Sequence, residues 1–437
     1  MQRQSEVDVF TEEFRPRVHF TPARNWMNDP NGLLFYKGKY HLFYQHNPSG
    51  ILWGNMSWGH AVSTDLFTWE HLPVAIPCTD TAGIFSGSAV VDHKNSSGLG
   101  TTDNPPMVAI YTLHQNDESN QSQHIAYSLD EGITWTKYDG NPVLDLGMKD
   151  FRDPKVTWQE STKSWLMTVA KPQEFKIAFF TSQDLINWSH LSDFGPLGAT
   201  GGIWECPDLF PLHSENGETK WALIVSLNPG GIVGGSGTQY FIGDWNGKEF
   251  TTTQTKTLWI DYGRDNYAGV TFGDAPNNRK IFIGWMCNWD YASKLPSPIW
   301  RTSMTTPREL QLLSIGDEIR LTANPIAEMK SEHDYSFTIN ANENTEIVIG
   351  DESKKVLVTF DAATKTVSLD RSAAWYPNLE DRIQTTPPIE LQEFTIRLVL
   401  DHGSVELFIP EAGLALTSLM DLPATRPILK NPAKPLP

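Results

Sequence analysis

The sequence predicts an all-β protein, with a five-bladed β-propeller followed by a C-terminal β-sandwich. Three observations predict this fold. Short apolar or alternating runs, broken by Gly, Asn, Asp and Pro, fill the first 300 residues without a long helical periodicity. These runs recur about every sixty residues. Beyond about residue 323 the strands alternate without the repeat, and 15 of the 16 tryptophans fall at or before Trp300.

Five apolar runs define the repeat. They start at Tyr40, Met107, Trp165, Trp221 and Ile281, so successive starts are separated by 67, 58, 56 and 60 residues. An Asp-centred turn keeps a similar step, at Asp65, Asp130, Asp184 and Asp244. A period near sixty with several strands per unit is typical of a propeller, whereas a sandwich with coincidentally similar hairpins is the alternative.

The length also favours two domains, because 437 residues exceed one ordinary core. We expect the propeller over residues 15–315 and the sandwich over 323–437, with Pro307 to Pro325 carrying the junction. Alternating strands are expected at Glu346 to Ile349, Lys355 to Phe360, Thr395 to Leu400 and Val405 to Ile409. Together they match a small sandwich of about a hundred residues.

Composition excludes several classes of protein. The formal net charge of −18 argues against nucleic acid or an anionic membrane surface as partner, since both need a cationic face. No apolar run approaches the roughly 20 residues of a membrane-spanning helix. The polar start, Met1 to Asp8, lacks the apolar core of a signal peptide, so we expect an extracellular protein if a leader was removed and a cytoplasmic one otherwise. The three cysteines give no zinc or disulfide spacing.

The first repeat contains the stretch Asn25 to Gly32, which reads NWMNDPNG and places Asp29 among turn-forming residues. A structural turn is the simplest interpretation of this stretch alone. However, Asp153 and Glu205 precede the third and fourth apolar runs, and each of the three acids is followed within two positions by Pro. The second and fifth repeats carry FSGS at Phe85 to Ser88 and YAG at Tyr267 to Gly269 instead.

The first strand of each blade lines the central channel of a propeller, so equivalent positions of different blades should meet at its axis. Three acids in one cavity repel one another, and at least one should have a raised pKa. A metal site is one possible use of such a cluster. Arg152 beside Asp153, and the many tryptophans, suit a sugar better. Glycoside hydrolysis needs two carboxyl groups flanking the scissile bond.

These motifs resemble glycoside hydrolase family 32, which comprises invertases, exo-inulinases, levanases and related β-fructofuranosidases. The resemblance rests on WMNDPNG at Trp26 to Gly32, FSGS, FRDP at Phe151 to Pro154 and WECPD at Trp204 to Asp208, in the family's order. Further segments, including Trp53 to His60, extend it over about residues 15–310. The sandwich segment matches the family less well.

The resemblance implies a role for each motif residue. Asp29 would be the nucleophile that attacks the anomeric carbon of a terminal fructose, Glu205 the general acid and then the base, and Asp153 the stabiliser of the transition state. Substrate-binding positions implied by the family are Asn28, Gln45, Trp53, Phe85, Ser86, Arg152 and Trp285. No metal and no cofactor is implied, and the partner would be sucrose or a fructan. The alternative for each is a purely structural role. The two tryptophans would pack in the core, and Gln45 and Ser86 would form hydrogen bonds with buried backbone groups.

We therefore expect a retaining, exo-acting hydrolase of fructans and sucrose that works through a fructosyl-enzyme intermediate. Four alternatives stay open: a sucrose-specific invertase, a fructosyltransferase using the same intermediate, an enzyme for phosphorylated sucrose, and a noncatalytic fructan-binding propeller. The sequence does not decide among sucrose, inulin and levan, nor the oligomeric state.

Overall fold

The computed structural model describes residues 15–214, 217–297, 299–316 and 318–430. Met1 to Asp8, used above in the leader argument, and residues 431–437 of the expected sandwich lie outside these ranges. The described chain is built of β-strands and short 3₁₀ turns, and none of its helical segments is long and apolar enough to cross a membrane. The prediction of an all-β protein is therefore confirmed.

Five sheets form the N-terminal part of the described chain. The first contains β1 (Asn25–Tyr36), β2 (Lys39–Asn47), β3 (Ser57–Ser63), β4 (Trp69–Ile76) and, parallel to β1, β21 (Trp300–Arg301). The second contains β5 (Ala82–Val91), β6 (Met107–Gln115), β7 (Gln121–Ser128), β8 (Thr136–Lys137) and β9 (Leu144–Met148). The third contains β10 (Arg152–Gln159), β11 (Ser164–Lys171), β12 (Lys176–Ser182) and β13 (Trp188–Phe194).

The fourth sheet contains β14 (Ile203–His213), β15 (Thr219–Asn228), β16 (Gly237–Trp245), β17 (Phe250–Thr251) and β18 (Leu258–Trp259). The fifth contains β19 (Tyr267–Thr271), β20 (Ile281–Met286), β22 (Ser303–Met304), β23 (Arg308–Ile315) and β24 (Glu318–Pro325). The five predicted apolar runs form β2, β6, β11, β15 and β20, which is the second strand of each sheet. The 3₁₀ turns are η1 (Pro172–Glu174), η2 (Pro276–Asn278), η3 (Ala292–Lys294), η4 (Ser372–Ala374) and η5 (Pro410–Ala412).

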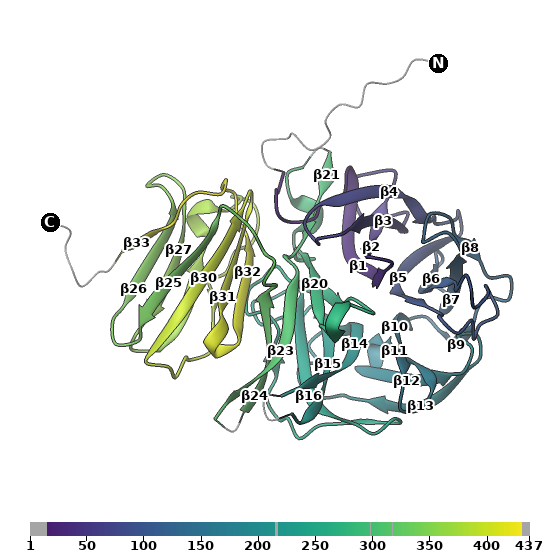
Figure 1. Cartoon of the computed structure of the whole chain (residues 1–437). Coiled ribbons are helices and arrows are strands. Elements are labelled where there is room, and N and C mark those ends of the chain that lie inside the picture. The colour runs from purple at the N-terminus through teal and green to yellow at the C-terminus, as the bar shows by residue number, and fades with distance from the viewer. Residues whose placement is uncertain (1–14, 215–216, 298, 317, 431–437) are drawn as a thin grey trace, which may run out of the picture.

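The five sheets are arranged around a common axis, with β1, β5, β10 and β14 innermost (Figure 1). The innermost strands contact one another in a closed ring, since β1 touches β5 and β19, β10 touches β5 and β14, and β14 touches β19. The Asp-centred turns lie at the outer strands. In the first sheet the Asp65 carboxylate accepts hydrogen bonds from the backbone N–H groups of Phe67 and Thr68 and from the Ser63 hydroxyl, which closes the turn between β3 and β4.

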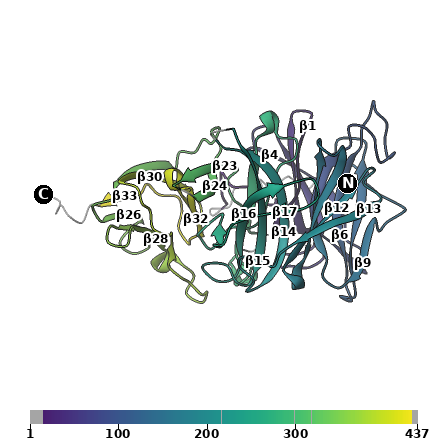
Figure 2. The same ribbon diagram turned by 90° about the horizontal axis from the view of Figure 1, so that it is seen from below.

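Two further sheets form the C-terminal part. One contains β25 (Asp334–Asn340), β30 (Glu393–Asp401), β31 (Ser404–Ile409) and β32 (Leu414–Leu419). The other contains β26 (Thr345–Gly350), β27 (Lys355–Asp361), β28 (Thr366–Asp370), β29 (Gln384–Thr385) and β33 (Ile428–Lys430). Each expected strand of this region corresponds to an observed one. Figure 2 shows this part beside the N-terminal sheets, at one side of the ring.

Buried ionic groups join the two parts. Arg308 on β23 donates hydrogen bonds to Asp261 at 2.8 Å and to Glu406 on β31 at 2.6 Å, and its guanidinium is fully buried. His19 lies between Asp401 at 2.9 Å and Glu406 at 3.0 Å. Because removing one member of a buried ionic network leaves the others unpaired, this junction holds the two parts in a defined orientation.

Candidate active site

A register shift interrupts each innermost strand at the same end of the ring. The shifts fall between Met27 and Pro30 in β1, Ile84 and Gly87 in β5, Arg152 and Lys155 in β10, Glu205 and Asp208 in β14, and Tyr267 and Val270 in β19. Such bulges bend the strand and redirect a side chain. Asp153, Cys206 and Ala268 lie inside these shifts with positive φ values of 66°, 47° and 53°. The local distortion thus turns side chains of all five strands toward the axis.

Cys206 shows that the acids of the first, third and fourth sheets meet there. Its Sγ lies 3.7 Å from Asp29 Oδ2 and 3.5 Å from Asp153 Oδ2, and its backbone N–H donates to the same Asp153 oxygen at 2.9 Å. Glu205, the preceding residue, accepts a hydrogen bond at 3.0 Å from Nε of Arg152, the neighbour of Asp153. Three acids separated by up to 176 positions of sequence therefore share one set of contacts.

Asp29 is held by two side-chain donors. The Ser86 hydroxyl donates to Oδ2 at 2.7 Å, and the Asn28 amide donates to Oδ1 at 3.0 Å. Burial raises the pKa of Asp29, and the charge of Glu205 raises it further, whereas the hydrogen bonds from Ser86 and Asn28 lower it. These two donors therefore favour the ionised carboxylate in a cavity that otherwise disfavours it.

The pKa of Asp153 is shifted in the same direction. Burial, together with the charge of Glu205, raises its pKa to about 7, although the Arg152 guanidinium opposes the shift. The expectation that at least one of the clustered acids has a raised pKa is met by both aspartates. Asp153 is 6% exposed, so its carboxylate is buried among these contacts.

Glu205 is held from two sides. Arg152 donates to Oε1, and the Tyr267 hydroxyl from β19 donates to Oε2. Arg152 is oriented in turn by Asp150 at 2.8 Å and by the Gln121 amide oxygen at 3.1 Å. The glutamate side chain keeps 18% of its surface exposed, so it remains accessible from the cavity.

The other predicted binding residues differ in exposure. Trp53 is 48% exposed and meets Phe85 edge to face, with ring centroids 6.1 Å apart. Asn28 is buried and accepts a hydrogen bond from the Trp26 indole at 2.7 Å. Gln45 is also buried and donates to the Ile84 carbonyl at 3.0 Å, which is the backbone role that we named as its alternative. Asn28 contacts Asp29 directly, and Phe85, which precedes Ser86, brings Trp53 to the same side of the site.

Trp285 on β20 is fully buried. Its ring lies against Trp26, Tyr267 and Trp289, with centroids 6.2, 6.4 and 4.8 Å away. This arrangement corresponds to the core-packing alternative. Its packing against Tyr267 nevertheless supports the residue that holds Glu205.

Several contacts of the site had no counterpart in the sequence predictions. Tyr267 had no predicted role, and Cys206 had no predicted partner, whereas its thiol lies against Asp29 and Asp153. The YAG motif, at the same register as the acids, was the available signal for Tyr267. Nothing in the sequence marks Gln121, whose oxygen also accepts the Phe151 N–H at 3.0 Å. Within the described ranges, no group of three or more His, Cys, Asp or Glu side chains is arranged to hold a metal ion.

Comparison with known proteins identifies the family. Residues 19–325 match the N-terminal domain of glycosyl hydrolases family 32, and residues 303–420 match the C-terminal domain of the same family. A levanase of Bacillus subtilis is 50% identical over 75% of this chain, which spans about half (49%) of that protein. An extracellular exo-inulinase of Aspergillus niger is 40% identical, with 94% of this chain and 90% of the relative covered.

A solved structure agrees with the sequence matches. The crystal structure of an exo-inulinase from Aspergillus awamori superposes with a TM-score of 0.88 at 34% identity, covering 97% of this chain and 96% of the other. The two matched domains, the named relatives and this solved structure all indicate the same family as the motifs of the inner strands. The chain belongs to glycosyl hydrolases family 32.

Proposed function

We propose that this protein is a retaining, exo-acting β-fructofuranosidase that releases terminal fructose from fructans and from sucrose. The observation that carries the proposal is the meeting of Asp29, Asp153 and Glu205 around Cys206 at one end of the ring. The named relatives, a levanase and exo-inulinases, support the choice of a fructose polymer as substrate class.

In the first step, an Asp29 oxygen attacks the anomeric carbon of the fructosyl unit. The glycosidic C–O bond breaks, and the Glu205 carboxyl group donates its proton to the departing oxygen. In the second step, Glu205 removes a proton from water, the water oxygen attacks the same carbon, and the ester to Asp29 breaks. Fructose is released, and both carboxyl groups return to their starting states.

The remaining contacts suit this reaction. Ser86 and Asn28 favour the ionised form of Asp29 that a nucleophile needs. We propose that Asp153 and Arg152 hold sugar hydroxyl groups as positive charge develops on the ring. We further propose binding roles for Asn28, Gln45, Trp53, Phe85 and Ser86, with Trp285 supporting the wall from behind. Exposed Trp53 offers an aromatic surface at the entrance.

We also propose the architecture that goes with this function, namely a five-bladed propeller over residues 15–315 and a sandwich over 323–437. The closed ring of five innermost strands supports five blades. The hairpin of β23 and β24 lies at the junction, and the pairing of β24 with β23 supports assigning it to the fifth blade.

The test is release of fructose from sucrose, inulin and levan, with products separated by chromatography. Asp29→Ala should lower kcat by about four orders of magnitude or more while leaving the fold intact. Asp139→Ala, at an exposed aspartate, is the matched control. Full activity of Asp29→Ala would refute the mechanism.

Two further measurements separate the alternatives. Glu205→Ala should lose little activity on fructosides whose leaving group needs no protonation, and an equal loss on all substrates would contradict its role as acid. At high sucrose concentration, oligosaccharides exceeding free fructose would instead indicate a fructosyltransferase. Fructan binding without any turnover by the unmodified protein would indicate the noncatalytic alternative.

A further inference from the structure

A second cavity lies at the opposite end of the same inner strands. Its volume is about 770 Å³, within the range of roughly 300 to 1,000 Å³ that is typical of small-molecule sites. Val90 of β5, Lys155 of β10, Asp208 of β14 and Thr271 of β19 each contribute to its lining. None of the three proposed catalytic acids does. We call this cavity the distal pocket.

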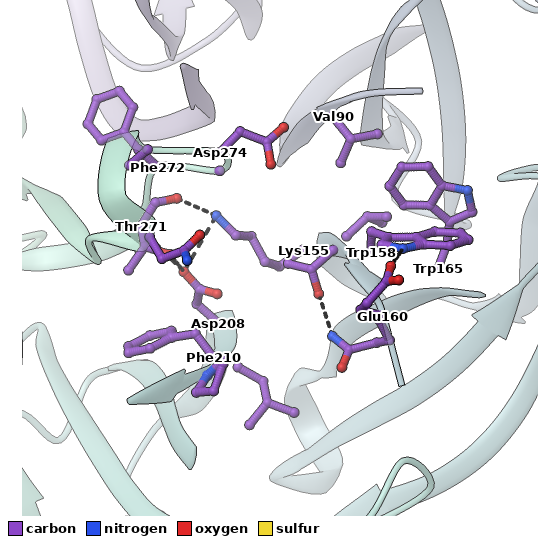
Figure 3. A pocket seen from close by; sticks show the side chains of 18 of the residues that line it. Val90, Lys155, Trp158, Glu160, Trp165, Asp208, Phe210, Thr271, Phe272 and Asp274 are labelled. Carbon is purple, nitrogen blue, oxygen red and sulfur yellow. Dashed lines mark hydrogen bonds and ion pairs between the residues drawn. The ribbon is translucent and has the colours of Figure 1, made fainter. Parts of the chain in front are cut away.

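Three lining residues of the distal pocket, Lys155, Asp208 and Thr271, contact one another and form what we call its polar floor. Lys155, two residues beyond Asp153 on β10, donates to the Thr271 carbonyl and lies 3.5 Å from Asp208 Oδ2 (Figure 3). Thr271 donates to the same Asp208 oxygen through its N–H at 2.8 Å and its hydroxyl at 2.7 Å. These contacts join β10, β14 and β19 within the lining of the distal pocket.

One buried polar atom of the distal pocket lacks a partner. Asp208 Oδ1 accepts no hydrogen bond from any described residue. Lys280 is partly buried in the same lining, and burial lowers its pKa although the charges of Asp208 and Asp274 oppose the shift. A buried polar group without a partner is costly. A ligand that donates a hydrogen bond would satisfy the Asp208 oxygen, and Lys280 supplies a donor in the same lining.

The charges of the lining select among ligands. Four cationic side chains, Lys94, Lys155, Arg279 and Lys280, are balanced by four anionic ones, Asp92, Glu160, Asp208 and Asp274. Neither an anion nor a cation is favoured by this balance. Hydroxyl groups are both donors and acceptors, so they match the unsatisfied Asp208 oxygen and the ammonium groups of the same lining.

The walls are aromatic on two sides. Phe210 and Phe272 flank the Asp208 side, and Trp158 and Trp165 form the wall across from it (Figure 3). Trp158 is partly exposed, its indole N–H donates to Glu160 at 2.8 Å, and the Lys94 ammonium lies 4.5 Å from its ring centroid. A sugar ring packs its apolar face on aromatic side chains, and its hydroxyl groups bind hydrogen-bonding side chains. The distal pocket offers both in one cavity of balanced charge. We propose that the distal pocket binds a short neutral saccharide.

The test is a calorimetric titration of sucrose into full-length Asp29→Ala. This background is chosen because it prevents turnover. Sucrose should bind at two sites, the active site and the distal pocket. Lys280→Met in that background should weaken binding at the distal pocket at least about tenfold. Lys248→Met, at an exposed lysine between β16 and β17, should leave binding at both sites unchanged. Trp158→Ala should reproduce the loss, which guards against a local effect of the lysine change. Unfolding midpoints of all variants report whether they fold.

Activity separates this proposal from the proposed function. In the unmodified background, Lys280→Met should hydrolyse sucrose with a kcat/KM within about twofold of the parent, since none of the three proposed catalytic acids lines the distal pocket. An isotherm that Lys280→Met and Trp158→Ala both leave unchanged would overturn the proposal. So would tighter binding of inorganic phosphate than of sucrose at the Lys280-dependent site, because it would identify an anion site. Neither result depends on whether the protein hydrolyses fructosides.

Discussion

His19 provides a sharp test of the junction between the two parts of the chain. Its ring nitrogens contact Asp401 and Glu406, and the side chain is fully buried. Burial alone would lower the pKa of His19, but the hydrogen bonds and charges of the two carboxylates outweigh it and raise the pKa to about 9. The imidazolium form therefore stabilises the native state.

The size of the effect follows from linkage. The ordinary pKa of 6.5 describes the unfolded chain, and about 9 describes the folded one. At about 1.4 kcal/mol for each pH unit between them, the protonated histidine contributes roughly 3 kcal/mol. Because the folded pKa is the higher one, this contribution is fully present below pH 6.5 and is lost as the pH rises through 9.

The assay is urea unfolding of the parent and of His19→Gln between pH 6 and pH 9, followed by tryptophan fluorescence. The parent should be more stable at pH 6, and its advantage in free energy of unfolding should shrink by roughly 3 kcal/mol by pH 9. His190→Gln, at a half-exposed histidine paired with Asp193, is the surface control for the loss of an imidazole. An advantage that stays constant with pH would refute the assignment of a charged His19.

Three further predictions concern the active site. Ser86→Ala removes the strongest hydrogen bond that lowers the pKa of Asp29, so the acid limb of the kcat/KM profile should move to higher pH; an unmoved limb would contradict the role of Ser86. Tyr267→Phe removes a donor to Glu205 and should lower kcat/KM about ten- to a hundredfold with little change in the unfolding midpoint, since such bonds are worth about 1.5 to 3 kcal/mol. Trp53→Ala, at a half-exposed ring, should raise KM for inulin while kcat stays near the parent value, and a loss confined to kcat would argue against binding there.

The strand repeat and the meeting of the three acids could both be predicted from the sequence alone. The five apolar runs fall on the second strand of five sheets, because alternation and turn residues record local strand geometry. The carboxylates stand at matching register positions, so a ring of inner strands brings them together. Trp285 was harder to place, since an aromatic residue beside a site looks the same in sequence whether it faces the cavity or lies behind it.

The sequence by itself determined the all-β class, the places where strands turn and which acids share a register. The tertiary structure alone decided which atoms meet: Tyr267 with Glu205, Cys206 with two aspartates, and His19 with a residue 382 positions away. It also revealed the distal pocket, whose floor combines three strands. The physical reason is that periodicity is a local property of the chain, whereas partners across the ring are set only when its strands close on one another.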